Sequence, residues 1–285
     1  MNKLWKNKFL WIGLCFVGLC SLGVFTWLLS ASHKNHWEVY TEVQPELLQQ
    51  VRKSQKKLVL IVGTENCDLC KDLLRMIEKD PETLKFLKKH AYLCYIDDSK
   101  GPHQKSIHHS LFQISYPVTY VFDSELNLFS YFRGSPYDYA SQLKRILTTS
   151  CLDLHDYANL KVSSLMPTHY ENIRKENVPQ MLGNSFLANI YLETAPEKAL
   201  QYAKRSIEYG SFFYNNYIAH KCLLALEKPE EAEVYKKQAL FFHGLRDWFH
   251  FEDEFAELGV PAPQDFIEYK ERLRKKHAEA RMTRQ

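Results

Sequence analysis

The sequence predicts an α/β domain with a mixed central sheet flanked by helices, an all-α domain after it, and a transmembrane helix before it. Three observations carry this prediction. Short apolar runs rich in β-branched residues alternate with helix-like runs between residues 37 and 150, which is typical of an α/β fold. Only helix-like runs follow between residues 151 and 285. Residues 9–30 carry no charged side chain, and about 20 apolar residues cross a bilayer as a helix.

The N-terminal part, residues 1–36, is expected to be a membrane anchor and a linker. Lys3, Lys6 and Lys8 precede the apolar run, and only Lys34 lies close behind it. The positive-inside rule then predicts a single-pass protein of the inner (cytoplasmic) membrane, with its soluble part facing the periplasm or the exterior. A cleaved signal peptide is the alternative, because residues 30–32 form a small-residue cleavage site. Both interpretations place the remaining chain where disulfides persist.

Composition places the chain among globular proteins and argues against several classes of function. The 285 residues are 45% hydrophobic and 25% charged, as in a protein of one large or two ordinary domains. The net charge is +3, and no basic patch is interleaved with aromatic residues, so we expect no nucleic-acid partner. Nucleotide-binding loops and the serine-hydrolase motif are also missing from the sequence.

The expected elements of the α/β domain alternate along residues 37–150. They are an edge strand at 37–40, a helix at 45–55, a strand at 58–62, helices at 67–79 and 81–89, a strand at 91–97, a helix at 103–113, strands at 118–122 and 128–132, and a helix at 136–147. Asp80 followed by Pro81 marks one helix start, since Asp is a good N-cap residue and Pro suits the first helical position.

The all-α domain, residues 151–285, contains a self-match. The run that starts at Pro196 recurs at Pro229, 33 residues later, and the expected helices are 178–192, 196–209, 213–226, 229–242 and 264–281. Helix-hairpin repeats of the tetratricopeptide type have a period of about 34 residues, so this region resembles two degenerate repeats. Its basic tail, residues 270–285, is a solvated helix face or a contact for an acidic partner or an anionic lipid surface.

The sequence around Cys67 and Cys70 carries the chemistry. The two cysteines are separated by two residues and lie where an apolar strand ends and a helix begins. The N–H groups and the dipole of a helix start stabilise a thiolate, which is the reactive form of cysteine. The spacing lets one thiol resolve a mixed disulfide made by the other. Half of a zinc site, or two buried thiols, remain alternatives for the pair alone.

A second motif, Tyr116-Pro117, opens the apolar strand at 118–122. Proline is confined to strand starts, edges and bulges, and an X-Pro bond is the bond that can be cis. Together with the cysteine pair, this motif resembles the thioredoxin superfamily over residues 37–150. The resemblance implies a thioredoxin-like fold in which Cys67 attacks, Cys70 resolves and Tyr116-Pro117 contacts the substrate. It also implies that electrons travel through the cysteines, so we expect no organic cofactor and no metal.

The sequence departs from thioredoxin itself at the site. Asn66 replaces the usual Trp, Asp68-Leu69 replaces Gly-Pro, and Ile61 stands where thioredoxin has a buried acid. The chain is more similar to membrane-tethered, periplasm-facing members of the superfamily. That similarity implies exported disulfide-containing proteins as clients and a membrane or thioredoxin-type electron donor, with the helical domain binding a client or positioning the active site.

Charges beside Cys67 bear on the direction of the reaction. Glu65 and Asp68 flank it, and Lys71 opposes them from one turn further on. Negative charges raise a thiol pKa, which favours the disulfide form relative to the thiolate. We therefore expect a disulfide reductase or isomerase in preference to an oxidase.

Two other classes of function stay open. Copper-delivery proteins of thioredoxin fold use two cysteines and a histidine, and here Cys67 and Cys70 have His103, His108 and His109 as candidate partners. Alternatively, the chain is an exported interaction scaffold, in which the helical region binds a partner and the α/β domain is inactive.

Overall fold

The computed structural model describes residues 39–111, 116–133, 138–149, 174–241 and 245–282. The chain divides into two compact units, residues 1–38 and 39–285, so the described residues all belong to the second unit. The expected anchor at 9–30 lies outside them. Among the helices of the described ranges, none is long and apolar enough to cross a membrane.

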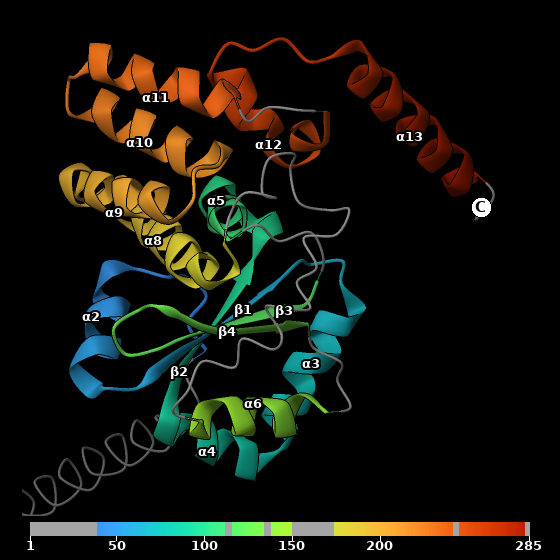
Figure 1. The fold of residues 1–285 in the computed structure, drawn as a ribbon. Helices are drawn as coiled ribbons and strands as arrows, with labels where there is room; N and C mark the ends of the chain where they lie inside the picture. The colour runs from blue at the N-terminus through green and yellow to red at the C-terminus, as the bar shows by residue number, and fades with distance from the viewer. Residues whose placement is uncertain (1–38, 112–115, 134–137, 150–173, 242–244, 283–285) are drawn as a thin grey trace, which may run out of the picture. The chain divides into compact units, whose positions relative to one another are not determined.

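The centre of the α/β part is a four-stranded mixed sheet (Figure 1), as expected. The strands are β1 (Lys57–Gly63), β2 (Ala91–Asp97), β3 (Val118–Phe122) and β4 (Leu128–Arg133), in the order β2-β1-β3-β4. β1 runs parallel to β2 and antiparallel to β3, and β4 returns antiparallel to β3. The predicted edge strand at 37–40 is reduced to an isolated bridge between Tyr40 and Cys94, while residues 37 and 38 are outside the description.

Helices cover both faces of this sheet (Figure 1). They are α2 (Pro45–Ser54), α3 (Asp68–Lys79), α4 (Pro81–His90), α5 (Pro102–Ser110) and α6 (Tyr139–Thr148). The face formed by Leu58, Leu60 and Val62 belongs to a core that also contains Leu48 of α2. The alternate residues of β1 point to the face that α3, α4 and α6 cover (Figure 1), because successive side chains of a strand point to opposite sides.

Local chemistry explains where these helices begin and end. The Asp80 carboxylate accepts hydrogen bonds from the backbone N–H groups of Glu82 and Thr83, both at 3.1 Å, and Pro81 occupies the first turn of α4. This confirms the predicted helix start. At the C-terminal end of α6, the carbonyls of Ile146 and Thr149 accept hydrogen bonds of 3.0 and 2.9 Å from Lys57 Nζ of β1. A strand lysine thus satisfies the otherwise free carbonyls at the end of α6.

The described residues after 173 form helices without a strand, as expected for an all-α region. After a short 3₁₀ turn, the helices are α8 (Val178–Tyr191), α9 (Pro196–Tyr209), α10 (Phe213–Ala225), α11 (Pro229–Phe241), α12 (Leu245–Glu257) and α13 (Gln264–Met282). The sequence does not single out α12. Its residue Phe251 has non-helical backbone angles, so the segment consists of two shorter helices joined at a kink, and short helical segments give a weaker signal in the sequence than long ones.

The sheet and the helical region share one continuous hydrophobic core, which extends from Val43 to Phe266. Phe122 of β3 stacks on Phe186 of α8 with ring centroids 4.6 Å apart. Gly183 allows α8 to approach β4, since a Cβ there would lie 3.1 Å from the backbone nitrogen of Leu128. α5 lies between the two parts and supplies residues to both, as described below.

Candidate active site

The cysteine pair lies at the junction of β1 and α3. After β1 ends at Gly63, the chain turns so that the Cys67 N–H donates to the Thr64 carbonyl at 3.0 Å. Cys67 is the N-cap of α3, and its Sγ accepts a hydrogen bond of 3.1 Å from the Cys70 N–H. The two residues form a disulfide with an S–S distance of 2.11 Å. The first turn of α3 therefore directs an N–H group at the sulfur that the helix dipole also favours as an anion.

The two sulfur-bearing residues differ in exposure. Cys70 is fully buried, whereas Cys67 is only partly buried. Leu69 lies between them and is 52% exposed. A nucleophile must be reachable by its substrate. The geometry therefore favours Cys67 as the attacking cysteine and Cys70 as the cysteine that resolves the mixed disulfide. Leu69 provides apolar surface beside the accessible cysteine.

Each carboxylate beside Cys67 has a lysine partner. Lys71 Nζ lies 3.7 Å from Asp68, and Lys100 Nζ lies 3.8 Å from Glu65. All four side chains are largely solvated, and exposed pairs of this kind are weak. The pairs nevertheless offset the negative charge near the thiol. The sequence did not indicate the Lys100 pair, because Lys100 lies in the 3₁₀ turn that follows β2 and is far from Glu65 along the chain.

Tyr95 and Gly63 surround the buried sulfur. A Cβ on Gly63 would lie 2.6 Å from Tyr95 Oη and 2.9 Å from Cys70 Sγ, so the hydroxyl and the sulfur share the space above this glycine. Burial, together with the charges of Asp97 and Asp98, raises the pKa of Tyr95 to about 12. Its hydroxyl is therefore a neutral O–H donor at physiological pH. The sequence analysis did not assign either residue to the site. The signal that could have indicated them is a glycine at the end of a buried strand, which allows a close approach of other side chains.

Tyr116 belongs to a hydrogen-bonded cluster around Asp98. The Asp98 carboxylate accepts from the hydroxyls of Tyr116 and Thr64 and lies 3.2 Å from His108 Nδ1. Burial raises the pKa of Asp98, but these hydrogen bonds and the His108 charge outweigh it, and the pKa is lowered. The pKa of Tyr116 is raised by burial and by Asp98.

This cluster connects the two sequence motifs of the site. Thr64 is hydrogen-bonded both to the Cys67 N–H and to Asp98. Tyr116 is half-buried against the ring of His108, and the Tyr116–Pro117 peptide is cis, with Pro117 buried at the start of β3. The chain thus places the cysteine turn and the Tyr116-Pro117 loop on the two sides of one carboxylate.

The histidines proposed as copper ligands have other partners. His108 faces Asp98, and His109 Nδ1 lies 2.5 Å from Glu254 Oε1 of α12. The side chain of His103 is outside the described residues. Within the described part of the chain, no three His, Cys, Asp or Glu residues are arranged to hold a metal ion. The Cys₂His set is therefore not assembled by these side chains.

Comparison with known proteins adds no assignment. No protein-family model matches the chain, and no curated protein is significantly similar to it in sequence. The fold and the geometry of the cysteine site are therefore the basis for inferring the function.

Proposed function

We propose that the chain is a thiol–disulfide oxidoreductase of thioredoxin-like fold that acts on exported proteins. The observation that carries this proposal is the Cys67–Cys70 disulfide at the first turn of α3, with one cysteine accessible and the other buried. An exchange site needs this asymmetry, because the substrate meets one sulfur while the second acts only on the intermediate.

The fold supports the resemblance to thioredoxins. A parallel β1–β2 pair and an antiparallel β3–β4 end form the sheet. The cysteine pair follows β1, and Pro117 precedes β3. In this superfamily the corresponding loop pairs with an extended substrate, a form of strand addition, and Tyr116 and Pro117 are the residues that would make this contact here. The tetratricopeptide-like helical region and the membrane anchor at residues 9–30 belong to the same proposal.

The reaction proceeds in two exchange steps. The Cys67 thiolate attacks a substrate disulfide, forms a mixed disulfide and releases one substrate thiolate, which takes a proton from solvent. The Cys70 thiolate then attacks Cys67 Sγ, re-forms the Cys67–Cys70 bond and releases the second substrate thiolate. Two electrons pass to the substrate, and an external dithiol donor in the membrane or of thioredoxin type returns them. The Cys70 N–H stabilises the Cys67 anion, and the Tyr95 hydroxyl lies beside Cys70 Sγ.

The direction proposed is reduction or isomerisation. Glu65 and Asp68 disfavour the Cys67 thiolate, although their lysine partners lessen this effect. A potential near the thioredoxin value of about −270 mV is therefore expected, and not one near the value of about −120 mV that is typical of a strong oxidant.

The test is the reduction potential of the full-length chain in mild detergent. We would equilibrate it against glutathione buffers and read the cysteine state by thiol labelling and mass. One two-electron transition is expected, lost in Cys67→Ser and retained in Cys222→Ala. Cys222 is a suitable control because it is a buried free thiol whose pKa burial raises to about 12.

Two outcomes would contradict the proposal. A midpoint near that of strong oxidants would overturn the direction of electron flow. Absence of any transition, with copper retained by the reduced protein, would overturn disulfide exchange and favour the copper-delivery alternative.

A further inference from the structure

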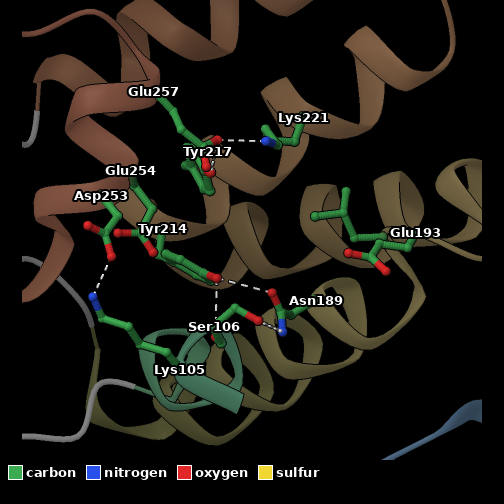
Figure 2. Close-up of a pocket in the computed structure, with 11 residues that line it drawn as sticks. Lys105, Ser106, Asn189, Glu193, Tyr214, Tyr217, Lys221, Asp253, Glu254 and Glu257 are labelled. Atoms are coloured by element: carbon green, nitrogen blue, oxygen red, sulfur yellow. Dashed lines mark hydrogen bonds and ion pairs between the residues drawn. The ribbon is translucent and has the colours of Figure 1, made fainter. Parts of the chain in front are cut away.

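Two neighbouring cavities adjoin the C-terminal end of α8, and we call them together the α8 cleft. The first, of about 190 Å³, lies between α5, α8, α10 and α12, and Figure 2 shows its lining. The second, of about 520 Å³, lies between residues 42–46 and the turn from α8 to α9. Asn189 and Glu193 line both cavities. Clefts between packed elements are where small ligands usually bind.

The cleft is acidic. Six carboxylates line it against three lysines; the carboxylates are Glu42, Glu46, Glu193, Asp253, Glu254 and Glu257, and the lysines are Lys105, Lys198 and Lys221. An excess of negative charge within a partly enclosed space attracts cations and repels anions.

The lysines of the cleft are already engaged. Lys105 Nζ lies 2.5 Å from Asp253, and Lys221 Nζ lies 2.6 Å from Glu257. Lys198 Nζ lies 3.8 Å from the ring centre of Tyr191. Among the described residues, Glu42, Glu46 and Glu193 have no ion-pair partner, and Glu193 is the one of these three that lines both cavities.

Glu254 provides an independent sign of a missing partner. Its side chain is only 9% exposed, and Oε1 pairs with His109. Its other oxygen, Oε2, is buried without a hydrogen-bond partner in the described part of the chain. A buried carboxylate oxygen left without a donor is costly, and a ligand ammonium in the first cavity supplies such a donor.

Aromatic groups and a helix end complete the environment. Tyr214 and Tyr217 lie between the α12 carboxylates and the Asn189–Glu193 side of the first cavity (Figure 2). Tyrosine faces attract ammonium groups. The C-terminal end of α8 also presents the negative end of its helix dipole to both cavities.

We propose that the α8 cleft binds a linear organic polycation, a small polyamine, with Glu193 and Glu254 receiving its ammonium groups. Two adjoining cavities that share Glu193 suit an extended ligand with separated charges. A metal ion fits less well, since the described residues contain no group of three metal ligands. The site is separate from the cysteine chemistry, so its test does not depend on redox activity.

The experiment is calorimetric titration of the full-length chain with spermidine, in mild detergent at physiological salt. Glu193→Gln is expected to weaken binding about tenfold or more, because a charge-assisted contact is lost. Glu193 is exposed, so the fold should persist, with an unchanged melting temperature. Glu197→Gln is the matched control, since Glu197 is exposed nearby on α9 and does not line the cleft; its binding should stay within about twofold.

Three further probes discriminate the ligand. Butylamine should bind more weakly than spermidine, because it carries one charge. An acetylated dilysine peptide presents the same alkylammonium chemistry, and tighter binding of this peptide would identify a polypeptide as the source of the cation. Equal weakening in both Gln variants, competition by an equal concentration of Mg²⁺, or no binding heat from spermidine would each overturn the proposal.

Discussion

At the scale of single residues, the site depends on a position without a side chain. Gly63 ends β1 where Tyr95 Oη and Cys70 Sγ both approach the backbone. The absence of a Cβ lets the phenol of the neighbouring strand lie beside the buried sulfur. In the proposed exchange reaction, a neutral hydroxyl in this place would donate a hydrogen bond to the Cys70 thiolate and stabilise it.

Replacement of this glycine tests the arrangement. Gly63→Ala places a methyl group 2.6 Å from Tyr95 Oη, and the crowding should lower the free energy of unfolding by about 1–3 kcal/mol. Urea denaturation of the oxidised protein measures it. The double variant Gly63→Ala/Tyr95→Phe removes the nearest atom and should recover part of the loss. Full stability of the single variant would contradict the described packing.

At the scale of elements, α5 connects two parts of the molecule through successive histidines. His108 faces Asp98 and the Tyr116 ring, whereas His109 pairs with Glu254 of α12. Burial, together with the smaller effect of the charges of His108 and His109, lowers the pKa of His250 in α12 to about 4. The folded protein therefore favours the neutral form of His250.

The lowered pKa of His250 predicts that the stability of the fold depends on pH. The pKa of His250 is lower in the folded state than the unfolded value of about 6.5. The contribution of the neutral His250 side chain to the free energy of unfolding is complete above pH 6.5, and it is lost as the pH falls toward 4. Between pH 7 and pH 5 the wild type should lose about 1–2 kcal/mol more than His250→Gln. Urea denaturation at both pH values measures the difference, and equal losses would contradict the burial of this imidazole.

At the scale of the whole molecule, the described residues from 39 onward share one core. Phe122 of the sheet and Phe186 of α8 stack, and the Tyr214 hydroxyl of α10 donates to the Ser106 carbonyl of α5 at 3.1 Å. Buried apolar contacts of this extent join elements into one cooperative unit. The α/β part and the helical part are thus expected to unfold together.

Phe186→Ala tests this cooperativity. Phe186 is fully buried, and its truncation should cost about 3–5 kcal/mol. Hydrogen exchange, followed by mass spectrometry, should show an equal loss of protection in β1 and in α10. Phe241→Ala is the control, since Phe241 is 73% exposed and should change stability by less than about 0.5 kcal/mol. Loss of protection in α10 alone would show that the two parts unfold separately.

The sequence predicted the features that depend on neighbouring residues. The apolar run before Cys67, the Asp80-Pro81 helix start and the strand after Pro117 are all local patterns, and the structure contains each of them. It did not predict the Asp98–His108–Tyr116 cluster or the position of Tyr95. Their partners come from separate strands and helices, so they become neighbours only when the chain folds.

Tyr40 has a consequence for the outer edge of the sheet. Its N–H donates to the Leu93 carbonyl at 3.1 Å, and its carbonyl accepts from the Tyr95 N–H at 2.8 Å. β2 is a terminal strand of the sheet, and an uncovered terminal strand invites a second molecule to pair with it and to start a polymer. Tyr40 alone thus occupies backbone hydrogen-bonding groups at the middle of β2, and it discourages fibrillar self-association through this edge.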